Sequence, residues 1–395
     1  MKLGYIHSSK DERARVMQVL KMTSESVALD ELGIGRIRDA FADRMFPGVS
    51  TLQKHLKYFS LMPQVYRKAT EKQYNRLSEV SAEIVRLERI MTKNLCDGTA
   101  KEDRKGITGS DTIDKGSDRF VKYDPAYIYN SGLLTFEILR STQVAELIYS
   151  TSKALNKAAK AQTNDSEDIA DDAAEKPGLF QFCSFPSVDY DFTQACSLPL
   201  TPAERDFITD HILKAKACQG TLLRWLVANP DTEVHKDFED FNCEILPKDL
   251  ANVVDLAKRF ANFIYMVHVR YNCIYSNYAD DEVLKKFDEL REAYLQSGTD
   301  IDTVMAAVNI RENSGKLFCK EVAKYIAAKD YDRLDQAIIS RERRVKGSRH
   351  KIGNPAYKYD KKNRIHYYKL NYRWETVRQF LIELSGAKGK EFANG

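Results

Sequence analysis

Apolar residues recur every three or four positions along most of the chain, which is the spacing of amphipathic helices. A first stripe near the N-terminus consists of Ile34, Ile37, Phe41 and Met45. A second stripe, after a Pro-Gly break, consists of Leu52, Leu56 and Phe59. Two helices joined by a short turn that contains glycine are typical of a helix-turn-helix. We therefore expect the second helix over residues 51–62, with Ser50 as its N-cap.

Later segments carry equally local helix signals. In "LTPAERDFITDHIL", Thr201 is placed as an N-cap, Pro202 as the first helical residue and Glu204 as the partner in a capping box. Residues 253–275 are apolar nearly all round, which indicates a central buried helix. The chain is therefore predicted to be mainly α and multi-helical.

Three segments depart from the helical spacing. Residues 2–7, "KLGYIH", have the pattern of one short strand. Residues 161–178 contain six acidic residues and no aromatic residue, so we expect a mobile acidic linker. Residues 357–368 alternate around an Asp360–Asn363 turn and predict a small β-hairpin between two helices. This order resembles a winged helix, with residues 358–364 as the wing.

These patterns divide the chain into five predicted regions. They are an N-terminal helical region with helix-turn-helix character at 1–95, a loop with helices at 96–160, the acidic linker at 161–178, a helical domain at 179–340, and a basic hairpin with a C-terminal helix at 341–395.

Composition excludes several classes of protein. The seven cysteines are odd in number and include no C-x-x-C pair, which argues against a disulfide framework and against a closed zinc site. No apolar run approaches the roughly 18 residues that a membrane span needs. The first residues turn charged at once and lack the apolar core of a secretory signal. We expect a cytoplasmic protein without a membrane segment.

The common catalytic motifs are absent from the sequence. There is no phosphate-binding G-x-x-x-x-G-K-[ST], no G-x-S-x-G elbow and no H-E-x-x-H. Arg38 occupies the place of the third glycine in the single G-x-G candidate. We therefore predict no catalytic residue, no metal and no cofactor.

Two weaker enzymatic candidates stay open. His268 and Arg270 lie on the most apolar helix, where a satisfied core histidine and a paired arginine are the favoured interpretation. The cluster of acidic residues and one histidine at 233–240 is interpreted as a solvated acidic loop. If a hidden active site exists, these are the residues to inspect.

Positive charge is concentrated near the C-terminus. The whole chain carries +4, whereas residues 341–374 hold twelve basic and two acidic residues, a local charge of +10. The candidate nucleic-acid contacts there are Arg343, Arg344, Lys346, Arg349, Lys358, Lys361, Lys362 and Arg364. Interleaved tyrosines offer stacking surfaces. Further candidates on the predicted helix 51–62 are Gln53, Lys54 and Lys57, which lie off its apolar face as in a recognition helix.

The block "DELGIGRIRDAFADRMFPGVSTLQKHLKYFSLMPQVY" (residues 30–66) resembles the signature of an uncharacterised bacterial domain family. A "GYIHSS" opening, an "LPLTPAE" helix start and the terminal residues 370–374, "LNYRW", are similar to that family as well. The resemblance implies a place in anti-phage defence islands, beside SNF2-type helicases and phospholipase-D-like nucleases, as in Azaca-type systems. It carries over no catalytic residue.

These observations together predict a non-enzymatic subunit that binds DNA and acts with separate helicase and nuclease subunits. The alternatives are a protein–protein adaptor that does not bind nucleic acid and an enzyme with a non-standard site. Salt dependence of DNA binding separates the first two hypotheses.

Overall fold

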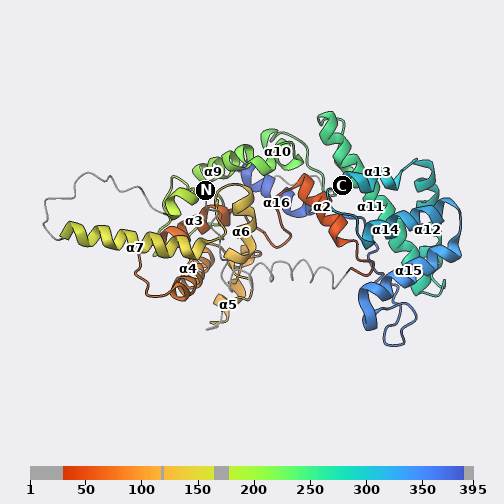
Figure 1. Cartoon of the computed structure of the whole chain (residues 1–395), viewed down its shortest axis with the longest axis horizontal. Helices are drawn as coiled ribbons and strands as arrows, with labels where there is room; N and C mark the ends of the chain where they lie inside the picture. The colour runs from red at the N-terminus through yellow and green to blue at the C-terminus, as the bar shows by residue number, and fades with distance from the viewer. Residues whose placement is uncertain (1–29, 117–119, 164–177, 387–395) are drawn as a thin grey trace, which may run out of the picture. The chain divides into compact units, whose positions relative to one another are not determined.

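The computed structural model describes residues 30–116, 120–163 and 178–386. Within these ranges the chain forms fifteen α-helices, labelled α2 to α16 (Figure 1), and no strand. A single isolated antiparallel bridge joins Leu139 and Cys183 in the same ranges. The prediction of a mainly α protein is confirmed. The predicted strand 2–7 lies outside the described residues, as does most of the predicted linker 161–178.

The helices belong to two compact units whose sequences alternate along the chain. Unit 1 takes its described residues from Met1–Met45 and Phe238–Tyr372, and Unit 2 takes them from Phe46–Asp237 and Arg373–Gly395. Each unit therefore combines two stretches that are far apart in sequence. No helix in the described ranges has both the length and the apolar character that crossing a bilayer requires.

Unit 1 is organised around one long helix. Its helices are α2 (Gly35–Met45), α11 (Lys248–Tyr275), α12 (Asp281–Gln296), α13 (Ile301–Ala307), α14 (Ser314–Ala327) and α15 (Tyr331–Lys346). Helix α11 contacts α2, α12, α13 and α15 (Figure 1). Every residue from Phe263 to Ile274 is buried, which confirms the predicted central helix.

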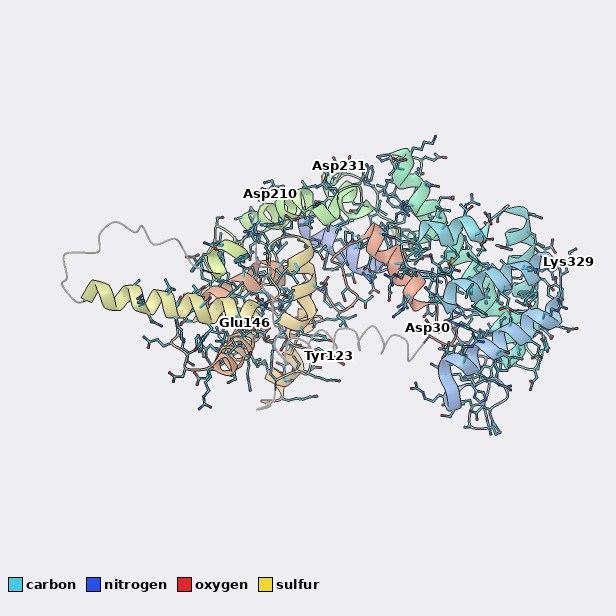
Figure 2. All side chains as sticks on the ribbon, viewed as in Figure 1. Asp30, Tyr123, Glu146, Asp210, Asp231 and Lys329 are labelled. Atoms are coloured by element: carbon cyan, nitrogen blue, oxygen red, sulfur yellow. The ribbon has the colours of Figure 1, made fainter. Side chains whose placement is uncertain are left out.

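Polar caps fix where the neighbouring helices of Unit 1 begin. The Asn313 side chain accepts hydrogen bonds from the first backbone amides of α14, and Asp330 accepts from the Arg333 amide at the start of α15. Lys329, labelled in Figure 2, has a φ of +56° in the turn that joins the two helices. The caps satisfy amides that helix ends leave unpaired, so they position α15 and the segment that follows it.

Unit 2 is centred on α3. Its helices are α3 (Lys57–Ala69), α4 (Leu77–Asp97), α5 (Ser110–Asp114), α6 (Pro125–Thr135), α7 (Val144–Thr163), α8 (Leu179–Phe182), α9 (Pro202–Lys214), α10 (Leu222–Ala228) and α16 (Trp374–Ser385). Helix α3 contacts α4, α6, α7 and α9. Both hydrogen bonds of the predicted capping box form at Thr201 and Glu204, which confirms the predicted start of α9.

The predicted recognition helix at 51–62 is wrong in its bounds and in its exposure. Residues 51–56 form a turn and a short irregular stretch, and α3 starts only at Lys57. Every residue of α3 from Lys57 to Tyr66 is buried. A recognition helix must present one face to the groove of DNA. Helix α3 has no exposed face between Lys57 and Tyr66, because other helices of Unit 2 pack around it.

The predicted β-hairpin, and the winged helix built on it, are also wrong. Among the described residues 347–373 there is one short 3₁₀ turn, Gly347–Arg349, and otherwise only loops. Side chains from α11 and α15 take the place of a strand partner. The Asn272 amide donates to the Ile365 carbonyl at 2.7 Å and accepts from the Ile365 amide at 2.8 Å. Glu342 accepts from the amides of Lys351 and Ile352 at 2.7 and 3.2 Å.

Candidate nucleic-acid-binding surface

The basic side chains of residues 341–372, here the basic segment, fall into two classes. The whole segment belongs to Unit 1. Five of its cations interact with carboxylates or carbonyls of the same unit: Arg341, Lys346, Lys351, Arg364 and Lys369. The remaining six are exposed. The net charge of the segment therefore overstates how many of its cations are available to a ligand.

Glu31, from the signature block, anchors the segment. Its carboxylate is 4% exposed and accepts hydrogen bonds from Lys351 Nζ at 2.8 Å and from His366 Nε2 at 2.6 Å. The Lys346 ammonium lies 3.9 Å away. Burial by itself would raise the pKa of Glu31, but the hydrogen bonds from His366 and Lys351 outweigh it and lower this pKa to about 2. Glu31 is therefore ionised and holds both ends of the loop.

Arg341 ties the same signature block to α15. Its guanidinium donates to the carbonyls of Leu32 at 2.7 Å and Gly33 at 3.1 Å. Gly33 has a φ of +63°, and a Cβ there would meet the Arg341 guanidinium at 2.8 Å, so both conformation and space require glycine. Asp30, labelled in Figure 2, accepts from the Gly35 amide at 2.6 Å and orients the start of α2. The block "DELGIG" thus serves as a docking site for the basic segment.

Arg364, a predicted DNA contact, forms ion pairs within the protein and is therefore not available to DNA. Its guanidinium pairs with Asp280 at 3.0 Å and with Glu282 at 2.7 Å. The Tyr359 hydroxyl also donates to Asp280, at 2.6 Å. These contacts fasten the loop 357–364 to the N-terminal end of α12, and we assign Arg364 a positioning role.

Six cations of the basic segment remain unpaired. They are Arg343, Arg344, Arg349, Lys358, Lys361 and Lys362, and each is exposed. None of these six side chains forms a hydrogen bond or an ion pair with the described residues, and only Lys361 interacts electrostatically with a carboxylate, that of Glu282, at longer range. Asp360 is the only acidic residue from 343 to 363, and it accepts from the Lys362 amide and the Asn363 side chain within its own turn. Two tyrosines of the segment are also exposed, Tyr357 by 37% and Tyr368 by 61%.

We call these six cations and two tyrosines the free basic surface. The residues belong to the last turn of α15, the 3₁₀ turn and the loops after it, which Figure 1 shows next to the end of α15. Asn354 folds the loop back, since its amide donates to the carbonyls of Ser348 at 3.2 Å and His350 at 2.8 Å. The surface is therefore a folded feature of Unit 1.

The other predicted contacts lie elsewhere. Lys346 is buried beside Glu31. In Unit 2, Gln53 is fully buried and its amide donates to the carbonyls of Gly48 and Ile128. Lys57 is 4% exposed, with its ammonium 2.7 Å from Glu204. Of the three N-terminal candidates only Lys54 is exposed.

Arg270 and His268 sit in the core of Unit 1. Arg270 forms two hydrogen bonds with Asp335, at 2.6 and 2.9 Å, so the predicted pairing of this arginine is confirmed. His268 is 3% exposed and its ring lies 4.8 Å from the His366 ring. Burial lowers the pKa of His268 to about 3, so it is neutral. Its Nε2 has no partner among the described residues, which differs from the satisfied histidine that we expected.

The acidic stretch 233–240 does not assemble a metal site. Glu233 is 78% exposed in its side chain, and its nearest approach to His235 is 3.8 Å. Glu239 accepts from Asn262 and Lys369 in Unit 1. No group of three or more histidine, cysteine or acidic side chains in the described ranges has the geometry to hold a metal ion. These residues carry no enzymatic proposal.

Replacing Asn272 by alanine should loosen the loop that ends at Ile365. The change removes both partners of the Ile365 backbone, and we expect a loss of about 1–3 kcal/mol in the free energy of unfolding of Unit 1. Hydrogen exchange of peptides around residue 365 measures it. Asn354→Ala, in the exposed part of the loop, serves as the milder control, and equal protection in the Asn272 variant and the parent would contradict the assignment.

Comparisons with known proteins give a family. No curated protein matches the chain, and no solved structure does. A model described as "Family of unknown function (DUF6361)" matches residues 1–297, well over half of the chain. The match includes the signature block 30–66, whereas the basic segment lies beyond the matched residues. The chain therefore belongs to the DUF6361 family.

Proposed function

We propose that this protein is a non-enzymatic DNA-binding accessory subunit whose free basic surface contacts the phosphate backbone. The observation that carries the proposal is the set of six exposed, unpaired cations between residues 343 and 362, a stretch in which Asp360 is the only acidic residue. Elsewhere in the same segment, cations are neutralised by carboxylates placed close by. A group of this many cations without hydrogen-bonded carboxylate partners favours a polyanionic ligand.

The physics of phosphate binding gives this surface a recognisable signature. Cations that neutralise phosphates release condensed counterions, so affinity falls steeply as salt rises. Contacts of this kind position the protein on DNA and carry no sequence information. We therefore propose binding that depends little on sequence.

The resemblance of the signature block supports a wider setting for this activity. We propose that the chain acts in a bacterial anti-phage defence system with a separate SNF2-type helicase and a phospholipase-D-like nuclease. In that arrangement the partners supply the chemistry and this subunit holds DNA. Co-purification with the neighbouring helicase and nuclease chains tests the assembly.

The DNA contact is tested by fluorescence anisotropy with short labelled DNA across a salt series. The variant Arg349→Ala/Lys358→Ala/Lys361→Ala/Lys362→Ala should bind at least tenfold more weakly, with a shallower salt slope by up to about 0.9 per lost phosphate contact.

The matched control removes four exposed cations from other parts of Unit 1: Lys285, Arg311, Lys324 and Lys329. It changes net charge equally and should alter affinity by less than about twofold. Equal weakening in both variants would show that only net charge matters and would overturn the assignment. Absence of binding at low salt would favour the adaptor, in which the same surface docks on an acidic partner.

A further inference from the structure

We infer that the free basic surface takes single-stranded DNA, with bases stacked on Tyr357 and Tyr368. This inference rests on the proposed function and adds the class of DNA. The observation behind it is the exposure of these two tyrosines, which contacts to phosphate do not explain.

The tyrosines of the basic segment, like its cations, fall into two classes: those with partners inside Unit 1 and those that are exposed. Tyr359 donates to Asp280 and its ring packs against Tyr275 at 5.4 Å. Tyr367 packs against Tyr265 at 5.9 Å, and Tyr372 is 2% exposed with its hydroxyl bonded to the Ala257 carbonyl. Only Tyr357 and Tyr368 present much of their rings to solvent in this segment.

Tyr368 is exposed but held in place. Its hydroxyl oxygen lies 3.2 Å from His366 Nδ1, and the two rings meet edge to face at 5.9 Å. His366 is fixed in turn by the buried Glu31 carboxylate. The ring is therefore positioned before any ligand arrives, and 61% of the residue stays open. A large aromatic ring kept at the surface of a segment that also carries unpaired cations matches the stacking platform of single-strand binders.

The backbone around these rings argues against reading a duplex. Base edges in the major groove are read by an inserted helix or β-ribbon. The basic segment after α15 offers neither, since its described residues are loops with one 3₁₀ turn. In a duplex the base faces cover one another, so stacking on tyrosine would first require unstacking. Unpaired bases present their faces without that cost.

The test compares a labelled single strand of mixed sequence with its duplex of equal length in one anisotropy salt series. We expect the single strand to bind at least tenfold more tightly. Tyr368→Ala and Tyr357→Ala should each weaken single-strand binding by about tenfold and leave duplex binding unchanged. Tyr368→Phe should retain binding, because stacking needs the ring and not the hydroxyl. Photocrosslinking with bromodeoxyuridine should label Tyr368 or Tyr357.

The outcomes distinguish this inference from the proposed function. Duplex binding as tight as single-strand binding, and sensitive to the four-cation variant, would keep the DNA contact and overturn the single-strand assignment. Unchanged single-strand affinity in both tyrosine→Ala variants would overturn the stacking. No binding to either DNA would overturn the function and the inference together. Circular dichroism of each variant checks that the helices are intact.

Discussion

Replacing Glu31 by alanine is expected to destabilise Unit 1 by about 3–5 kcal/mol in its free energy of unfolding. The carboxylate is 4% exposed, accepts hydrogen bonds from Lys351 and His366, and lies 3.9 Å from the Lys346 ammonium. Its removal leaves the ammonium groups of Lys346 and Lys351 partly buried and without their counter-ion. Breaking one side of a buried ion pair costs more than the pair itself contributes, because the remaining charge stays desolvated.

Hydrogen exchange read peptide by peptide is the measurement of choice, because two units need not unfold together. Protection should fall around residues 30–35 and 351–366, the two stretches that Glu31 joins. The control Glu244→Ala removes an exposed carboxylate of the same unit and should change stability by less than about 0.5 kcal/mol. Unchanged protection in the Glu31 variant would contradict the anchoring role.

The same carboxylate predicts an acid sensitivity with a definite sign. The pKa of Glu31 is about 2 in the folded protein and has a usual value of 4.5. The folded state therefore binds the proton less readily, so the stabilisation is complete above the unfolded pKa and is lost as pH falls toward 2. The shift corresponds to about 3 kcal/mol. Glu31→Gln should remove this part of the pH dependence, measured by urea unfolding between neutral and acidic pH.

The second large effect is expected in Unit 2, where Glu204→Ala should cost about 3–5 kcal/mol. Burial works against the ionised carboxylate, but Lys57 outweighs it and keeps the pKa of Glu204 below its usual value. The carboxylate accepts from Lys57 Nζ and from Ser60 Oγ, each at 2.7 Å, and from the Thr201 amide at 2.8 Å. Alanine would leave the Lys57 ammonium buried and unpaired and would also remove the capping box of α9.

Lys57 and Lys54 form a matched pair for this test, since the sequence pattern marked both as DNA contacts. Lys57→Met should destabilise Unit 2 by several kcal/mol, whereas Lys54→Ala should change stability by less than about 0.5 kcal/mol. The double variant Lys57→Met/Glu204→Gln should be less destabilised than the two single changes added together. A Lys57→Met protein of normal stability with weaker DNA binding would instead restore the recognition-helix hypothesis.

Local signals account for what was predicted correctly. The capping box at Thr201 and Glu204 acts within four residues, and the burial of α11 follows from apolar residues on every face of one helix. Neither feature needs a distant partner. The predicted β-hairpin was wrong because its backbone is held by a residue distant in the sequence. Alternation in residues 357–368 was real, but the backbone at Ile365 is satisfied by Asn272, 93 positions earlier.

The positive charge of residues 341–374 shows most clearly what the sequence determines and what only the tertiary structure decides. The sequence by itself determined that the chain is helical and that positive charge concentrates in residues 341–374. It did not determine which of those cations are free. Glu31 lies 335 positions before His366, and Asp280 lies 84 before Arg364. Only folding brings these carboxylates to the segment, because an ion pair depends on distance in space, and so only the tertiary structure decides which cations remain for a ligand.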